Sequence, residues 1–167
     1  GTIAKENGLE GLAKMLMTQN ADNVVSMASR FLNKNVPNAE EALQGARYII
    51  AEWVNERQTA REKMRALFKR EAIVSSVLSK KDKREDAQKY NDYFEFSEPT
   101  SRIKSHRILA ILRGENEGFL KVKIEPSEDK AFDILKPMFV RDTNAASEQV
   151  ALAVEEAYKR LLKPSLE

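Results

Sequence analysis

The sequence lacks cysteine, has a single histidine and contains no long run of apolar residues. Without cysteine the chain can form neither a disulfide nor a thiolate site, which is compatible with a reducing compartment. One histidine alone is a poor basis for a zinc site. No stretch reaches the roughly 18 apolar residues of a membrane-spanning helix, and no signal peptide opens the chain. These absences predict a water-soluble protein without a membrane partner.

An excess of either charge is also lacking. The chain of 167 residues has 28 Lys and Arg against 26 Asp and Glu, a formal net charge of +2. A module dedicated to nucleic acid usually has a larger basic excess, so the composition argues against autonomous DNA or RNA binding. Charged residues make up 32% and hydrophobic ones 42%, which is typical of a globular chain. The length predicts one helical domain over residues 1–167, expected to be monomeric.

The central stretch begins at Ser105, which can cap a helix. Gly114 stands where a helix end favours a residue that tolerates positive φ. Between them apolar residues cover most of the helix circumference, which predicts a central, largely buried helix with Leu109 and Leu112 inside. Together with its neighbours this helix forms the expected structural hub. The hub residues are Ser105, His106, Leu109, Leu112, Gly114 and Gly118.

Two segments have the pattern of strands. Residues 119–125 alternate between apolar and charged side chains. The segment 73–79 is short and rich in β-branched residues. No third strand of similar quality is visible, so we expect a two-stranded antiparallel element. The charged run at residues 80–86 is expected to be a solvated loop or a frayed helix start, and Ser97 to cap a helical turn.

The remaining segments have helical spacing. Asn38 is a good N-cap, Thr59 begins a capping-box pattern, Pro137 should end or kink its helix, and Pro164 should stop the last one. We therefore predict a mainly α protein of seven or eight helices with the small β element attached. The helices are expected near residues 9–18, 24–32, 38–54, 59–68, 105–114, 127–138 and 150–161.

Several runs of this sequence resemble the Tex family of bacterial transcription accessory proteins. They follow the order of the family and span nearly the whole chain. These runs are Thr2–Glu10, Glu41–Arg47, Lys89–Phe94, Ser97–Pro99, Ser105–Arg107, Leu109–Ile111, Arg113–Glu115, Glu117–Gly118 and Ala157–Glu167.

The resemblance implies a portion of the helical body of a larger cytoplasmic, multidomain protein that binds nucleic acid and is linked to transcription. Such proteins also contain a YqgF-type ribonuclease-H-like domain, helix-hairpin-helix motifs and an RNA-binding S1 domain. None of those patterns is found in this sequence. The resemblance is to the internal helical portion that lies N-terminal to the YqgF-like domain. The start at Gly1 rather than Met fits this expectation of a fragment.

Three groups of residues are candidate sites. His106 has no second histidine for a metal or catalytic site, so we expect a structural role and no cofactor. Gly114 and Gly118 follow a helix and precede a strand, the reverse of a phosphate loop. Basic residues could follow a phosphate backbone, although no aromatic stacking platform lies among them. These candidate nucleic-acid contacts are Arg102, Lys104, Arg107, Lys121 and Lys123.

Taken together, the sequence predicts a non-catalytic helical scaffold of a Tex-like protein, whose nucleic-acid contacts are made mainly by domains outside this sequence. The alternative is a protein-interaction module that docks onto the transcription machinery, which requires an exposed apolar patch. An enzyme would instead require a pocket with titratable groups around His106.

Overall fold

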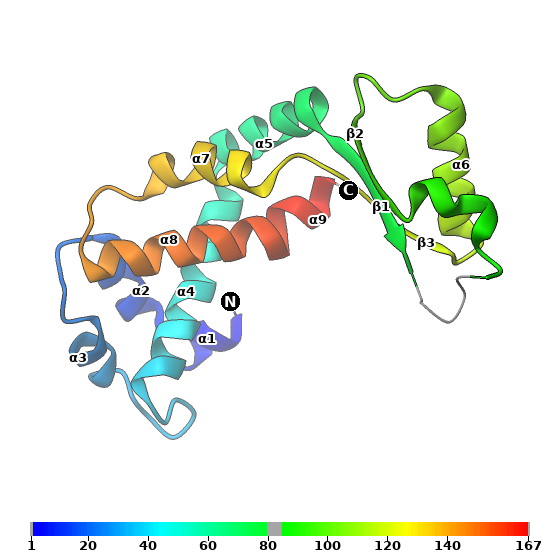
Figure 1. Cartoon of the computed structure of the whole chain (residues 1–167). Coiled ribbons are helices and arrows are strands. Elements are labelled where there is room, and N and C mark those ends of the chain that lie inside the picture. The colour runs from blue at the N-terminus through cyan, green and yellow to red at the C-terminus, as the bar shows by residue number, and fades with distance from the viewer. Residues whose placement is uncertain (1, 80–84, 167) are drawn as a thin grey trace. The chain divides into compact units, whose positions relative to one another are not determined.

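The computed structural model describes residues 2–79 and 85–166, so residues 80–84 of the predicted charged loop lie outside the described part. The described chain forms two compact units. Unit 1 contains residues 2–65 and 129–166, and unit 2 contains residues 66–128 (Figure 1). Unit 2 is therefore an insertion in the sequence of unit 1. The expectation of one helical domain over residues 1–167 stays a prediction.

Unit 1 is helical, as the spacing of its apolar residues predicts. Asn38 caps the longest helix as expected, because its side chain accepts a hydrogen bond from the Glu41 N–H at 2.9 Å. The helices of unit 1 are α1 (Thr2–Glu6), α2 (Glu10–Met17), α3 (Val24–Ser29), α4 (Ala39–Glu56), the first part of α5 (Gln58–Glu71), α7 (Glu128–Phe139), α8 (Ala145–Ala157), the π-helix η3 (Tyr158–Leu162) and α9 (Lys163–Leu166).

The core of unit 1 lies where α4 packs against α8 and α2. Ile49, Ile50 and Val54 of α4 are buried, and so are Val150 and Val154 of α8. Each such side chain contributes about 1.5–3 kcal/mol through burial. These two helices therefore supply much of the stability of unit 1.

Three helix boundaries in unit 1 differ from their predicted positions. α5 begins at Gln58, so Thr59 lies inside its first turn instead of capping it. α7 continues through Pro137 to Phe139. The last helix does not stop at Pro164, because α8 is followed by a π-turn and then by α9.

Unit 2 is built on an antiparallel sheet of three strands in the order β2-β1-β3. The strands are β1 (Ile73–Leu78), β2 (Glu95–Pro99) and β3 (Leu120–Glu125), with the 3₁₀ helix η2 (Gln88–Tyr93) and α6 (Ser105–Asn116). The predicted pairing of β1 with β3 is confirmed, with Leu78 opposite Leu120. The prediction of a two-stranded element is wrong by one strand, and Ser97 lies in β2 instead of capping a helical turn.

The two faces of this sheet differ. Val74 and Ser76 of β1 are buried, and the register places Phe96, Val122 and Ile124 on their face. Since side chains alternate along a strand, Lys121 and Lys123 lie on the other face. A small core of Ala87, Tyr90, Phe94 and Leu120 fills the first face.

The hub helix α6 is not central. Leu109 is 62% exposed and Leu112 is 40% exposed, so the prediction that both are buried is wrong. The helix covers one face of a small sheet, and only its inner side is enclosed: Ile111 and Gly114 are buried there. A Cβ on Gly114 would lie 2.5 Å from Leu120 Cδ1, so a glycine allows α6 to approach β3 closely.

The predicted ends of α6 are also corrected. Its N-cap residue is Lys104 instead of Ser105, and no side chain caps it. Gly114 lies inside the helix, which continues to Asn116, and the residue with positive φ is Gly118, at +83°. The fold class nevertheless agrees with the sequence: the described chain is mainly α, with nine α-helical segments and one small antiparallel sheet.

Candidate functional site

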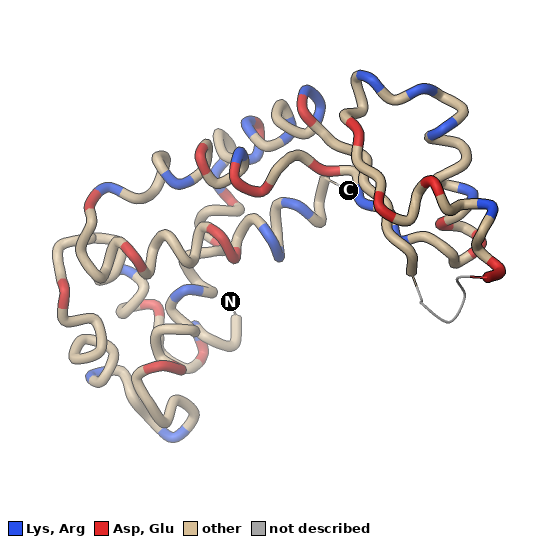
Figure 2. The backbone as a smooth tube through the Cα atoms, viewed as in Figure 1, with Lys and Arg blue, Asp and Glu red and all other residues tan. Residues whose placement is uncertain are grey.

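All five basic residues predicted to contact nucleic acid lie in unit 2. Arg102 lies in the turn after β2, Lys104 precedes α6, and Arg107 is in the first turn of α6. Lys121 and Lys123 are in β3. Figure 2 shows basic positions along the segment that joins β2 to α6. Each of the five side chains is exposed.

The two strand lysines share the face of the sheet that α6 does not cover. Lys121 lies opposite Val77, and Lys123 lies opposite Ser75. Val77 is 49% exposed, and on its other side it pairs with Glu95 of β2. The β2 residue level with Lys121 across the sheet is therefore the acidic Glu95, whereas the β2 residue level with Lys123 is Ser97.

Arg107 belongs to the opposite face. Its guanidinium carbon lies 5.8 Å from the centroid of the Phe96 ring, a cation–π contact. Phe96 pairs with the buried Ser76, on the face that α6 covers. The structure thus places Arg107 on one face of the sheet and Lys121 and Lys123 on the other.

His106 is exposed in the first turn of α6. Within residues 2–79 and 85–166, no three His, Cys, Asp or Glu side chains are grouped so that they could hold a metal ion. In the same residues no helix is long and apolar enough to cross a membrane.

A polar cluster that the sequence did not reveal joins η2 to the end of α6. The Tyr90 hydroxyl donates to Glu117 Oε2 at 2.7 Å, and Lys89 Nζ lies 3.1 Å from the same oxygen. These hydrogen bonds from Tyr90 and Lys89 lower the pKa of Glu117. Burial and the neighbouring Glu117 raise the pKa of Tyr90. The cluster connects the end of α6 to η2.

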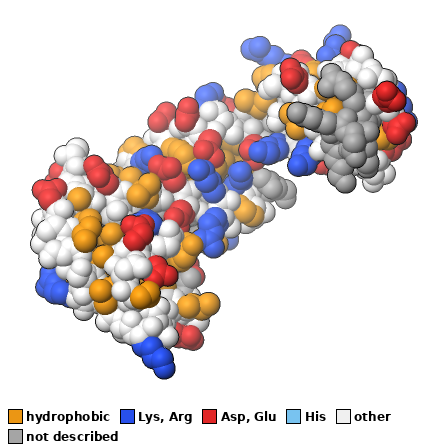
Figure 3. All heavy atoms as spheres, turned by 60° about the horizontal axis from the view of Figure 1, so that its bottom comes forward, with side chains coloured by type: hydrophobic (Ala, Val, Ile, Leu, Met, Phe, Trp, Pro, Cys, Tyr) orange, Lys and Arg blue, Asp and Glu red, His pale blue; other side chains and the backbone are white. Residues whose placement is uncertain are grey.

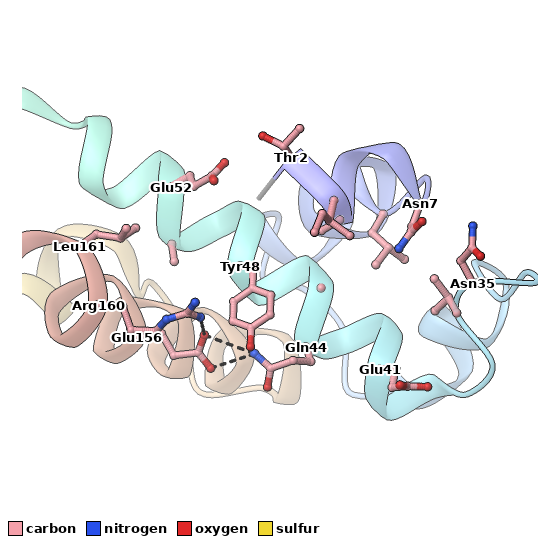
Figure 4. Close-up of a pocket in the computed structure, with 16 residues that line it drawn as sticks. Thr2, Asn7, Asn35, Glu41, Gln44, Tyr48, Glu52, Glu156, Arg160 and Leu161 are labelled. Carbon is pink, nitrogen blue, oxygen red and sulfur yellow. Dashed lines mark hydrogen bonds and ion pairs between the residues drawn. The ribbon is translucent and has the colours of Figure 1, made fainter.

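Unit 1 contains a cavity of about 660 Å³, lined by α1, the segment before α4, α4 itself and the region where α8 passes into η3 (Figure 4). Gln44, Tyr48 and Glu52 of α4 lie along one side, and Glu156 and Arg160 come from the opposite helix. Its apolar lining residues include Leu9, Val36 and Ala51.

Several polar side chains of this cavity contact one another. Gln44 Nε2 donates to the Glu156 carboxylate at 3.2 and 3.3 Å. The Arg160 guanidinium carbon lies 4.5 Å from the centroid of the Tyr48 ring, and Arg160 Nη1 lies 4.0 Å from Glu156 Oε2. Figure 3 shows acidic, basic and apolar side chains interspersed over one face of unit 1. These pairs hold α4 against the C-terminal helices.

A family model described as Tex central region-like matches residues 9–160. The chain belongs to the Tex family. The match covers unit 2 and most of unit 1, and it confirms the resemblance that the sequence runs indicated.

Relatives agree with this assignment. Protein YdcI of Bacillus subtilis is 32% identical over 99% of the Tex-family chain, and the Transcriptional accessory protein Tex of Neisseria gonorrhoeae is 37% identical over 76%. The human S1 RNA-binding domain-containing protein 1 is 28% identical over 75%. The chain spans 24%, 17% and 13% of the length of these three relatives, so it corresponds to one portion of much longer proteins.

Proposed function

We propose that this chain is a non-catalytic helical scaffold within a cytoplasmic Tex-like transcription accessory protein. In this proposal unit 1 is the frame, and unit 2 is an inserted module that makes weak electrostatic contact with nucleic acid. The observation that supports the proposal concerns buried polar side chains of unit 1. Their hydrogen bonds connect segments that are far apart in the sequence.

Gln19 is the first of these connections. It is 3% exposed and has a left-handed backbone with φ of 54°. Its side chain donates to the Phe139 carbonyl at 2.7 Å and accepts from the Arg141 N–H at 2.7 Å and the Ser147 hydroxyl at 3.0 Å. Asn144 donates to the Gln19 carbonyl at 2.5 Å. These hydrogen bonds connect the loop after α2 to the loop between α7 and α8.

Arg47 is the second connection. It is 7% exposed in the middle of α4. Its guanidinium donates to Gln149 Oε1 at 2.6 Å and to Gln44 Oε1 at 2.8 Å, and Nε lies 3.8 Å from Glu156 Oε1. A planar guanidinium with several donors suits such a site. Both connections join residues of unit 1 that are far apart in the sequence, which supports a structural role.

Nucleic-acid contact is proposed for Lys121 and Lys123, because both are exposed on the open sheet face. Arg102 and Lys104 are the further candidates, and Arg107 is the remaining one on the face covered by α6. The family relative with an S1 RNA-binding domain in its name supports a nucleic-acid role for the whole protein, made mainly by other domains. We expect the chain alone to bind at the non-specific level, with a Kd of roughly 10⁻⁴–10⁻⁶ M.

A gel-shift titration with duplex DNA and single-stranded RNA tests this proposal. Replacing Lys121 and Lys123 by Glu should abolish binding without unfolding the chain. The matched control replaces Lys5 and Lys34, two exposed lysines of unit 1, by Glu, which changes the net charge equally. Loss of binding in both variants would point to overall charge instead of a surface. Sub-micromolar, sequence-dependent binding that survives high salt would overturn the scaffold proposal.

The non-catalytic part of the proposal has its own test. The chain should not cleave DNA or RNA, with or without divalent metal. Metal-dependent cleavage that disappears in His106→Ala would show that the chain is an enzyme. The second candidate function, a protein-interaction module, is favoured by the exposed leucines of α6.

A further inference from the structure

We propose that the sheet of unit 2 binds the sugar–phosphate backbone of nucleic acid, and reads no base, through a row of three side chains: Lys123, Ser75 and Ser97. This set is called the donor row. The inference rests on the nucleic-acid contact proposed above for Lys121 and Lys123. It adds the two serines to that contact and identifies the chemical group that is bound.

The donor row lies on the open face, which is the face of the sheet that α6 does not cover. This face consists of every second residue of β3, β1 and β2, which lie side by side in the sheet (Figure 1). The register arranges its residues in three rows across the strands: Glu125, Ile73 and Pro99; Lys123, Ser75 and Ser97; Lys121, Val77 and Glu95. Of these rows, the donor row has a hydrogen-bond donor at every position.

The serine hydroxyls on the two faces of the sheet differ in their hydrogen bonding. On the covered face, Ser76 Oγ donates to the Tyr93 carbonyl at 2.7 Å. On the open face, Ser97 is exposed and Ser75 is half-buried. Neither of these two hydroxyls has a hydrogen-bond partner among the residues that the structure describes. Both are therefore available to an acceptor from another molecule.

The acceptor that suits the donor row is a series of anionic oxygens. Neighbouring strands lie about 4.8 Å apart, so the row spans roughly 10 Å from Lys123 to Ser97. A phosphodiester chain repeats its charged oxygens over such a distance, and Lys and Ser side chains are among those that contact phosphate oxygens. Lys121, in the next row, adds a second positive charge beside Lys123. A polymer of phosphates can therefore use the whole row, whereas a single phosphate ion cannot.

The rest of the open face offers no means of reading a base. None of its residues is aromatic, so bases have no ring on which to stack. Its two carboxylates lie at opposite corners, Glu125 on β3 and Glu95 on β2. Because like charges repel, these corners direct a polyanion to the donor row between them. Recognition is therefore confined to the backbone.

The salt dependence of binding separates the two kinds of donor. It is measured by fluorescence anisotropy of a short labelled single-stranded oligonucleotide at several salt concentrations. A neutral hydroxyl releases no counterion, so Ser75→Ala with Ser97→Ala should weaken binding roughly tenfold and leave the salt dependence unchanged. Lys123→Gln should instead reduce the slope of log K against log salt by about 1. The matched control, Ser26→Ala with Ser29→Ala, removes two exposed hydroxyls of α3 and should bind normally.

Three further probes identify the bound group. An abasic oligonucleotide of the same length should bind within about threefold of the original one, because the backbone supplies the contacts. Inorganic phosphate at the same concentration of phosphate groups should displace the oligonucleotide poorly. So should polyglutamate, since it lacks the condensed counterions whose release favours binding of a nucleic acid. Equal displacement by polyglutamate would show a general anion surface and overturn the proposal.

A single charge locates the surface. Glu95→Gln removes a carboxylate from the open face and should strengthen binding roughly twofold. The control, Glu115→Gln, removes an equal charge from an exposed position on α6 and should leave binding unchanged. An equal gain in both variants would mean that the overall charge of unit 2 is responsible, which would overturn the donor row.

The outcomes distinguish this inference from the proposed function. If Lys121→Glu with Lys123→Glu binds like the original chain, the nucleic-acid contact of the sheet fails, and the donor row fails with it. If binding depends on the lysines but not on Ser75 and Ser97, only the donor row is overturned. The same holds if the abasic oligonucleotide does not bind. Circular dichroism checks that each variant retains the original helical content.

Discussion

Gly45 shows how a single residue can decide the packing of unit 1. A glycine inside a helix usually destabilises it by up to about 1 kcal/mol relative to alanine, so Gly→Ala would ordinarily help. Here a Cβ would collide with Cδ1 of the buried Leu9, and the Cβ of Ala4 is 3.5 Å away. We expect Gly45→Ala to lower the free energy of unfolding by about 1–3 kcal/mol, measured in urea.

The control for Gly45 uses the residue that causes the collision. In a Leu9→Ala background the space is vacated, so adding Gly45→Ala should be neutral or stabilising. An equal loss in both backgrounds would show that crowding by Leu9 is not the reason for the glycine.

At the residue scale, the ionisation of Glu117 should make the stability against unfolding depend on pH. Its pKa is lowered in the folded state by the hydrogen bonds from Tyr90 and Lys89. A carboxylate with a lowered pKa adds stability that is fully present above its ordinary pKa of about 4.3 and is lost as the pH falls through the lowered value. Glu117→Gln should therefore reduce the acid sensitivity of unfolding below about pH 5. Urea titrations at several pH values measure this.

The control for this prediction is Glu115→Gln, on an exposed carboxylate two residues away. It should leave the pH dependence unchanged. If both variants flatten the curve equally, the general charge of unit 2 is responsible, and the Tyr90–Glu117 bond is not.

At the scale of elements, α6 has one buried side and one exposed side, and substitutions on the two sides should differ in their cost to stability. The fully buried Ile111 anchors it, so Ile111→Ala should cost about 2–5 kcal/mol of unfolding free energy. Leu112→Ala, at a position 40% exposed, should cost less than about 1 kcal/mol. Urea unfolding followed by circular dichroism measures both. A larger loss for Leu112 than for Ile111 would contradict the orientation of the helix.

The sequence predicted which segments form helices and strands better than it predicted how those segments are buried and paired. Long amphipathic helices such as α4, and the alternating strand β3, were predictable because their periods are local properties. The burial of α6 was not, because apolar residues all around a helix can mean either enclosure or a docking side. The strand β2 was missed because Ser97-Glu98-Pro99 also resembles a helix start. It forms because the β1 edge needs a partner, and Pro99 is tolerated at the edge of the sheet.

The candidate site was predictable only in part. The strand period correctly predicted that Lys121 and Lys123 face solvent. The separation of Arg107 from them depends on Phe96 of β2, which no local pattern identified. The Tyr90–Glu117 bond links residues 27 positions apart, and only the folded sheet brings them together.

At the scale of the whole molecule, unit 1 depends on contacts between its two separate sequence segments. Arg47 joins α4 to residues more than a hundred positions later, Gln149 and Glu156. No sequence pattern reports such pairs, because the partners lie more than a hundred positions apart and meet only in the folded unit. Closing so long a loop costs entropy, which the contacts between the segments must offset.

This dependence yields the last prediction. Removing one member of a buried charged network leaves its partners unpaired, so Arg47→Ala should lower the unfolding free energy by about 3–5 kcal/mol. Arg47→Lys should restore little, since an ammonium cannot reach Gln44, Gln149 and Glu156 together in the geometry of a guanidinium. The fluorescence of Trp53, in α4, reports unfolding of unit 1 in urea. Arg61→Ala, at an exposed position, is the control and should be nearly neutral.

Hydrogen exchange gives the sharper measurement: Arg47→Ala should lower amide protection in both α4 and α8, although the helices are distant in sequence. Loss confined to α4 would mean that Arg47 serves only its own helix, and the two segments of the frame would then be held together by apolar packing alone.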